Sequence, residues 1–252
     1  MNESRELRIR VPVLTRVEGE GALRIDSAEG RIERLQLSID EPPRLFEKLV
    51  EGHAYDALPD MLARVCGICP VAYQVTVAQA LEQLFACRLG PESQVLRRAM
   101  YCGEWLQSHS LHIHLLALPD FLGFDNALAL AERYPEQLRR GLRLQELGNR
   151  LIELLGGRSV HPVGLRVGGF HRLPERSAVE ALAAALEAAT EDAEALFHWC
   201  AGLDYPTDHQ VFTSVALSHP EDYAIEAGTI LSGGGLHIDI GDYEDWFEQY
   251  QL

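Results

Sequence analysis

The spacing of hydrophobic residues changes twice along this chain of 252 residues, and this change is the strongest constraint on its fold. Between residues 6 and 40, apolar and polar side chains alternate and turn residues separate the runs, which is typical of half-buried β-strands. Apolar residues then recur mostly at helical spacing as far as residue 202, before short strands and turns return. The pattern predicts an α+β fold, with a long central helix bundle and β-rich N-terminal and C-terminal segments.

Turn residues and helix breakers set the expected limits of these elements. Gly30 lies in the sequence SAEGR, which is typical of a hairpin turn. Pro119 is expected to end a long helix, and Val77, Leu81 and Leu84 share one face of another. The expected helices are residues 43–52, 57–64, 70–85, 92–117, 135–155 and 174–202, with a glycine- and proline-rich connection at 158–174.

Acidic side chains outnumber basic ones. The chain has 22 Lys and Arg against 38 Asp and Glu, so its formal net charge is −16. Such a chain repels phosphate backbones and anionic lipids, which argues against nucleic acid and membrane surfaces as partners. No apolar run reaches the roughly 20 residues of a membrane helix, and the sequence MNESRELRIR lacks the apolar core of a signal peptide. We therefore expect a cytoplasmic protein without direct membrane insertion.

The five cysteines are irregularly spaced and odd in number, which argues against a secreted disulfide framework. Cys66 and Cys69 form a CxxC motif that is followed by a proline, so Cys69 is expected beside a helix N-terminus, where a thiolate is stabilised. Cys87, Cys102 and Cys200 lie in helix-like stretches and are expected to be small buried apolar residues.

A CxxC motif can clip one metal ion or form a disulfide. Zinc normally takes four ligands, and the chain has no second CxxC that would complete a zinc ribbon. The motif falls between expected helices, whereas a thioredoxin-like pair would follow a strand of a parallel sheet. Two interpretations remain from the residues alone: a metal half-site completed by residues outside the chain, or a fortuitous pair of buried cysteines.

The residues around the motif resemble a known family. RVCGICP, at residues 64–70, resembles the N-terminal metal motif R-x-C-G-x-C of [NiFe] hydrogenase large subunits. TRVEGEGAL, at residues 15–23, resembles the early R-x-E-G-H element of that family, and SHSLHIHLLALPDFLG and HPVGLRVGGF resemble its central helix and glycine-rich connection. The matches are collinear and cover nearly the whole chain. The variant CGICPVAYQ is most similar to the cytoplasmic, NAD(P)-linked branch of hydrogenases and sulfhydrogenases.

The resemblance implies a role for each of five residues. Cys66 would be a terminal nickel thiolate, and Cys69 would bridge nickel to an iron that carries CO and cyanide ligands. Glu18 would shuttle protons, and Glu47, which stands 19 residues before Cys66, would bind Mg²⁺. Arg64 would hydrogen-bond groups around the cluster. From the residues alone, a surface carboxylate is the better interpretation of each glutamate, and a surface ion pair is an equal alternative for the arginine.

The chain departs from the family pattern at several points. Tyr73, Glu20 and Ser108 stand where many members carry two histidines and an aspartate. The C-terminal D-P-C-x-x-C motif, which supplies two further thiolates in the family, is absent from these 252 residues. We therefore expect one hydrogenase large-subunit-like domain over residues 1–252, truncated before that motif, that supplies at most half of the nickel ligands and is inactive by itself.

The resemblance implies reversible oxidation of H2 to protons and electrons. Electrons would pass to a small Fe–S subunit and on to NAD(P), through diaphorase-type subunits that carry flavin. One alternative is a metal-free scaffold or quinone-pocket relative, similar to the homologous subunit of respiratory complex I. Another is a structural zinc protein that shares its CxxC with a partner.

Three histidines are further candidates. His109 and His112 lie three residues apart, so they face the same side of a helix, where two ligands could meet a metal. Histidines of this kind are more often satisfied core residues, which is the interpretation we adopt. His161, in the sequence HPVG, is expected to be structural or to contact groups around the cluster.

Overall fold

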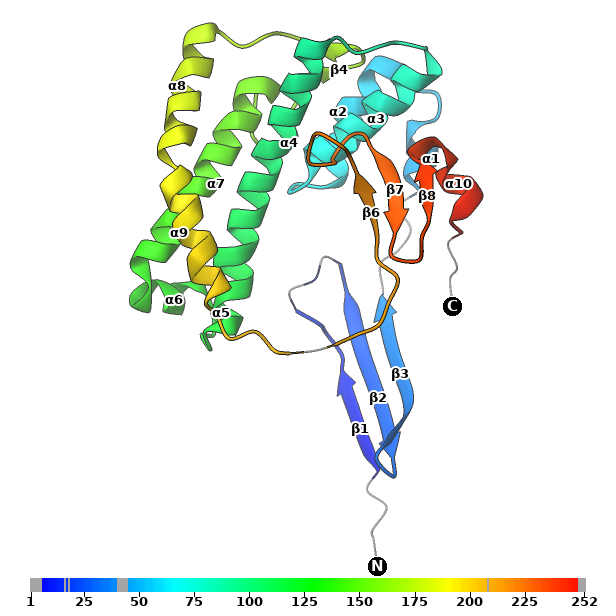
Figure 1. Ribbon diagram of the computed structural model, residues 1–252, viewed down its shortest axis with the longest axis vertical. Helices are drawn as coiled ribbons and strands as arrows, with labels where there is room; N and C mark the ends of the chain where they lie inside the picture. Colours follow the sequence, from blue (N-terminus) through cyan, green and yellow to red (C-terminus); the bar gives the residue numbers. More distant parts are fainter. Residues whose placement is uncertain (1–5, 16, 18, 40–44, 208, 249–252) are drawn as a thin grey trace, which may run out of the picture.

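A computed structural model of the chain describes residues 6–15, 17, 19–39, 45–207 and 209–248. Along the chain, a run of long helices separates an N-terminal sheet from a C-terminal sheet. In Figure 1 the N-terminal sheet projects below the body of helices, and the C-terminal sheet lies beside that body. This order matches the predicted α+β arrangement. Within the described ranges, no helix is both long and apolar enough to cross a membrane.

The structure contains the following helices and strands. The helices are α1 (Phe46–Val50), α2 (Leu58–Leu62), α3 (Pro70–Leu84), α4 (Pro91–Leu111), α5 (Leu118–Phe121), α6 (Ala127–Arg133), α7 (Pro135–Gly156), α8 (Arg176–Ala188), α9 (Thr190–Ala201) and α10 (Tyr243–Trp246). The strands are β1 (Leu7–Val11), β2 (Gly21–Ala28), β3 (Arg31–Ile39), β4 (Leu165–Arg166), β5 (Gly169–Phe170), β6 (Val215–Ser218), β7 (Thr229–Ser232) and β8 (His237–Asp239). The sheets have the antiparallel orders β1-β2-β3, β4-β5 and β6-β7-β8.

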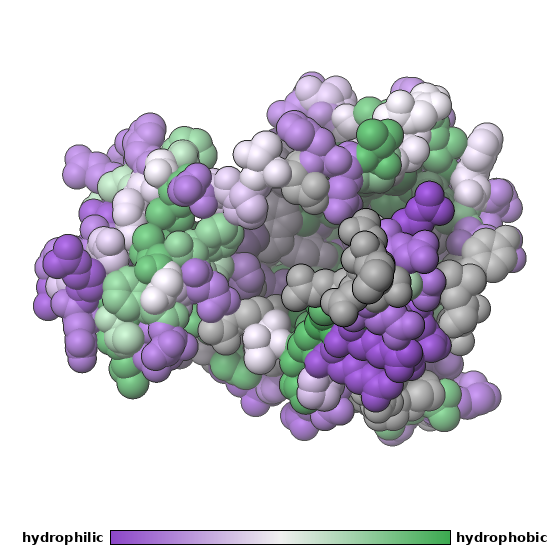
Figure 2. Space-filling view, turned by 90° about the horizontal axis from the view of Figure 1, so that it is seen from below, coloured by the Kyte–Doolittle hydropathy of each residue, from purple (hydrophilic) through white to green (hydrophobic). Residues whose placement is uncertain are grey.

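The N-terminal sheet has one aliphatic face and one basic face. Ile9, Ile25 and Leu35 pair across the three strands, so their side chains point to the same side. The same face carries Leu7, Val11, Leu23, Leu37 and Ile39, and the opposite face carries Arg8, Arg10, Arg24 and Arg34. Figure 2 shows a hydrophobic strip beside a block of hydrophilic residues on this sheet.

The aliphatic face of this sheet is exposed to solvent in the isolated chain, although the sequence pattern predicts half-buried strands. Leu35 is 64% exposed and Leu37 is 59% exposed. The predicted hairpin turn is confirmed, because Gly30 has φ +74° at the junction of β2 and β3. An apolar sheet face of this kind is typical of a surface that another polypeptide segment covers.

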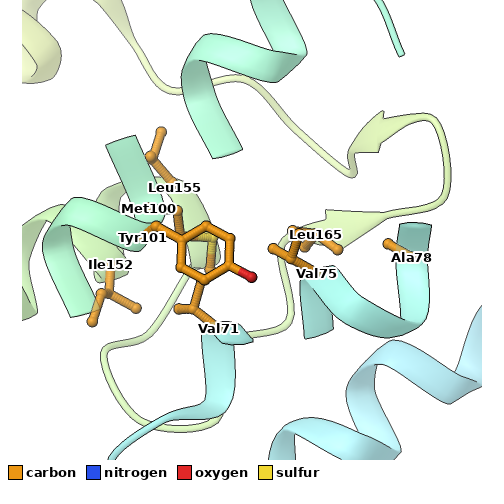
Figure 3. Close-up of a cluster of buried hydrophobic side chains, with 8 residues drawn as sticks. All are labelled: Val71, Val75, Ala78, Met100, Tyr101, Ile152, Leu155 and Leu165. Atoms are coloured by element: carbon orange, nitrogen blue, oxygen red, sulfur yellow. The ribbon is translucent and has the colours of Figure 1, made fainter. Parts of the chain in front are cut away.

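The main core lies where α3, α4, α7 and β4 meet (Figure 3). It is made of the side chains of Val71, Val75, Ala78, Met100, Tyr101, Ile152, Leu155 and Leu165. Two glycines let α4 and α7 approach closely, since a Cβ atom on Gly148 would lie 2.6 Å from the carbonyl oxygen of Gly103. The start of α3 therefore packs against two helices, α4 and α7, whose backbones are in close contact.

The apolar face predicted for α3 is buried only in part, since Leu81 is buried but the face is not buried throughout. Leu84 is 74% exposed, whereas Gln74 and Glu82 are buried. Each buried polar group has a partner from a distant element: Gln74 Nε2 donates to the carbonyl of Pro162 at 2.5 Å, and Glu82 pairs with Arg97 on α4. These bonds place Gln74 and Glu82 among the apolar core residues of α3, although Gln74 Oε1 has no partner within the described residues.

Two predicted helix limits also differ. Pro119 does not end the long helix: α4 passes into a π-helical turn over residues 112–117 and then into α5, with Pro119 in the first turn of α5. A wider turn of this kind accommodates a residue that lacks an N–H. The expected helix over 174–202 is divided at Ala189 into α8 and α9. Pro43, the predicted start of the first helix, lies outside the described residues.

Candidate functional site

The CxxC motif forms the connection into α3. A short 3-10 turn over residues 63–65 precedes Cys66, and Cys69 occupies the N-cap position of α3 directly before Pro70. This confirms the predicted helix start, which proline favours because its missing N–H needs no partner there. Both cysteines are half-buried.

The two cysteine sulfurs lie side by side. Their Cα atoms are 5.4 Å apart, and the sulfurs are paired as a disulfide. The backbone N–H of Cys69 donates to Cys66 Sγ at 3.1 Å. In the reduced state the same arrangement presents two thiolates to one metal ion, and thiolates suit soft metals such as nickel and zinc.

Helix α4 contacts this connection through two side chains that the sequence interpretation missed. The Glu104 carboxylate accepts the backbone N–H of Val71 at 2.6 Å and that of Ala72 at 3.2 Å. One turn later, Gln107 Nε2 donates to the carbonyl of Ile68 at 2.8 Å. Burial raises the pKa of Glu104 to about 7, against the lowering effect of the two backbone N–H groups. The sequence signal for this contact is a pair of polar residues three apart, which lie on one face of a helix.

The connection after α7 holds the other side of the motif. His161 Nδ1 lies 2.8 Å from the carbonyl of Ala63, in the turn before Cys66, and these atoms form a hydrogen bond. His161 has φ +48°, and its own carbonyl accepts a bond from Arg158 Nε at 2.5 Å. These contacts support the structural interpretation of His161.

The other predicted site residues are not drawn into this cluster of contacts. Arg64 lies in the turn before Cys66 with an exposed side chain, and Glu47 is exposed on α1. Glu18 lies outside the described residues. Among the predicted residues that the structure describes, Cys66 and Cys69 contact each other. The roles of all five residues stay predictions.

The burial expected for other cysteines and histidines is wrong. Cys87 and Cys102 are exposed and Cys200 is half-buried. His109 and His112 are exposed on α4 and the π-helical turn rather than satisfied in the core. The α4 helix is covered on the side that faces α3 and α7, and these side chains project elsewhere.

The buried histidine of this helix is His114, which sequence reasoning missed. It is 1% exposed, its Nδ1 lies 2.8 Å from the carbonyl of Ser110, and its Nε2 has no hydrogen-bond partner within the described part of the chain. Burial lowers the pKa of His114, so the neutral ring is favoured. Its ring fills the space beside Gly141, where a Cβ atom would lie 2.3 Å from it.

No third ligand joins the cysteine pair in the described part of the chain. Among those residues, no group of three or more His, Cys, Asp or Glu side chains is arranged to hold a metal ion. The described residues thus offer two adjacent thiolates, which fit part of a thiolate-rich site.

Comparison with known proteins gives consistent matches. A sequence model described as nickel-dependent hydrogenase matches residues 44–140. The alpha subunit of sulfhydrogenase 1 from Pyrococcus furiosus is 30% identical over 246 residues, which cover 97% of this chain and 58% of that protein. The alpha subunit of sulfhydrogenase 2 from the same organism is 37% identical over 175 residues, covering 69% of this chain and 42% of that protein.

Solved structures agree with these sequence matches. An NAD+-reducing [NiFe]-hydrogenase in the H2-reduced state has 29% identity and a TM-score of 0.75, covering 94% of this chain and 58% of that one. A Ni-Fe-Se hydrogenase from D. vulgaris Hildenborough has 24% identity and a TM-score of 0.67, which supports the fold alone. The chain spans less than three fifths of the length of these relatives.

Proposed function

The chain belongs to the nickel-dependent hydrogenase large-subunit family, and we propose that it is part of a catalytic subunit that converts H2 reversibly into protons and electrons. The observation that carries the proposal is the placement of Cys66 and Cys69. They lie side by side at the N-terminus of α3, inside the segment that matches the family. Two adjacent thiolates fit the Ni–Fe centre that membership of this family implies.

Each predicted site residue has a role in this proposal. Cys66 would hold nickel and Cys69 would bridge nickel and iron, with further thiolates supplied by polypeptide outside these 252 residues. The bound centre, whose iron would carry CO and cyanide, supplies the Lewis acidity that polarises H2. Glu18 would accept the proton that H2 releases, Arg64 would hydrogen-bond groups around the centre, and Glu47 would bind Mg²⁺.

The same proposal includes partners. Electrons must leave the site, and the chain's CxxC cannot hold a relay of Fe–S clusters, so we assign that relay to a small Fe–S subunit. The structural likeness to an NAD+-reducing [NiFe]-hydrogenase supports further diaphorase-type subunits with flavin and NAD(P). We assign this multi-subunit enzyme to the cytoplasm. Residues 1–252 would form one domain of its large subunit. The exposed aliphatic face of the N-terminal sheet is consistent with a chain that packs against other polypeptide.

The test is metal analysis combined with H2-dependent reduction of an artificial electron acceptor by the purified multi-subunit enzyme. We expect about one nickel per large subunit, and we expect Cys66→Ser and Cys69→Ser each to abolish both nickel retention and activity. Cys102→Ser is the matched control, because Cys102 is a free, exposed cysteine on α4. Zinc in place of nickel, or full activity in the Cys69→Ser enzyme, would contradict the proposal. Absence of any metal would favour the scaffold alternative.

A further inference from the structure

Helix α3 begins without a cap from its own sequence. Cys69 is the N-cap residue and makes no side-chain capping bond. The first N–H groups of a helix lack partners within the helix, and a buried N–H without a partner is costly. Here the N–H groups of Val71 and Ala72 are both taken by Glu104, 33 and 32 residues further along the chain. The missing cap is thus supplied by α4.

A second bond from α4 reaches the other side of Cys69. Gln107 follows Glu104 by one turn and donates to the carbonyl of Ile68. Cys69 therefore lies between two points that are held by the same helix, one directly before it and the other two residues after it. Because Glu104 is 3% exposed and Gln107 is 8% exposed, both bonds are shielded from competing water.

Helix α4 is itself fixed at this level. A Cβ atom on Gly148 of α7 would lie 2.5 Å from the backbone nitrogen of Gln107, so the two helices are in backbone contact at the residue that carries the second bond. A side chain that projects from this closely packed helix pair has a well-defined position. The packed pair of α4 and α7 therefore fixes the positions of Glu104 and Gln107, and these two side chains hold the connection that carries the cysteines.

We propose that Glu104 and Gln107 are positioning residues, which together set the location of the Cys69 sulfur relative to Cys66 for the metal centre. This inference rests on the proposed function for its metal part. Glu104 holds the first turn of α3 through two N–H groups, and Gln107 holds the carbonyl that precedes Cys69. Neither residue is assigned contact with metal or H2. Loss of either bond lets the cysteine connection shift against α4.

The experiment uses the intact multi-subunit enzyme and three variants. Glu104→Gln keeps the size of the side chain, but its amide can accept through one oxygen only, so one of the two N–H groups loses its partner. Gln107→Met keeps the length and removes the donor. Glu92→Gln is the matched control, because it makes the same chemical change at an exposed position on α4. Amide hydrogen exchange, alkylation of the two cysteines and the electron paramagnetic resonance spectrum of nickel are measured for each.

We expect Glu104→Gln to speed exchange at Val71 or Ala72 about tenfold. We also expect Glu104→Gln and Gln107→Met to shift the nickel spectrum at unchanged nickel content, with Glu92→Gln like the wild type. Wild-type exchange rates in Glu104→Gln, or an unchanged nickel spectrum in both variants, would overturn the inference. If Glu104→Gln does not assemble, the spectrum of Gln107→Met decides. A wild-type enzyme without nickel refutes the proposed function instead. In that case, faster amide exchange and faster cysteine alkylation in the variants than in the wild type would still show that Glu104 and Gln107 hold the cysteine connection, and wild-type rates would show that they do not.

Discussion

The buried guanidinium of Arg97 on α4 forms two hydrogen bonds with the carboxylate of Glu82 on α3, at 2.8 and 2.5 Å. The same guanidinium donates to the carbonyl of Arg166 at 3.1 Å, and Glu82 accepts the backbone N–H of Gly168 at 2.7 Å. One ion pair therefore joins two core helices to the β4–β5 hairpin. This pair lies inside the protein, where an unpartnered charge is strongly disfavoured.

Replacement of Arg97 by leucine should be strongly destabilising. The substitution leaves the Glu82 carboxylate buried without its cation, which costs roughly 3–5 kcal/mol in comparable sites. The free energy of unfolding from urea titration measures the loss. Arg176→Ala is the control, because Arg176 pairs with Glu180 at the surface, where such a pair contributes ~0.5 kcal/mol. Equal losses for the two variants would contradict the importance of the buried pair.

A side chain at Gly148 should separate α4 from α7. A Cβ atom there would lie 2.5 Å from the Gln107 nitrogen and 2.6 Å from the Gly103 carbonyl oxygen, and backbone atoms cannot move aside cheaply. We expect Gly148→Ala to cost about 1–3 kcal/mol of unfolding free energy. Gly90→Ala is the control, because a Cβ atom at Gly90 meets nothing closer than 3.7 Å. If Gly148→Ala has the same unfolding free energy as the wild type, α4 and α7 lie further apart at this point than the structure shows.

Features with a local cause could be predicted from the sequence. The alternation in residues 6–40 depends on neighbours along the strand, and it correctly predicted β1, β2 and β3. Pro70 favours a first helical turn by its own geometry, and it correctly placed Cys69 at the start of α3. The motif pattern around the cysteines identified the family, which the sequence and structure comparisons confirmed.

Features that depend on distant partners could not be predicted. The burial of Glu82 depends on a partner from another helix, Arg97, so hydrophobicity along α3 does not predict that this glutamate is buried. Glu104 meets Val71 across 33 residues, and no local pattern indicates that contact. His114 faces inward after the helix widens at residues 112–117, which shifts the positions expected from a regular helical spacing. Of these contacts, the Glu104–Val71 bond holds the start of α3 directly after Cys69, so this part of the setting of the candidate site required the structure.

Glu104 should make the stability of the protein depend on pH in an unusual direction. Its pKa is raised by burial to about 7 in the folded chain, from the ordinary value of 4.5. Between these two values the unfolded chain releases the proton while the folded chain retains it. The contribution of Glu104 is therefore fully present below pH 4.5, falls as the pH rises toward 7 and is lost above that. Each pH unit across this window corresponds to at most ~1.4 kcal/mol.

Urea titrations of the wild type and of Glu104→Gln at several pH values between 4.5 and 8 isolate this contribution. The difference in unfolding free energy between the two proteins should change in favour of the variant as the pH rises, and level off above pH 7. Burial raises the pKa of the neighbouring Tyr101, and the charges of Glu226 and Glu104 raise it further, so Tyr101 stays protonated throughout this range and does not distort the comparison. A difference that is constant with pH would show that Glu104 titrates as an ordinary carboxylate. The acceptor of the two N–H groups at the start of α3 would then be fully ionised near neutral pH.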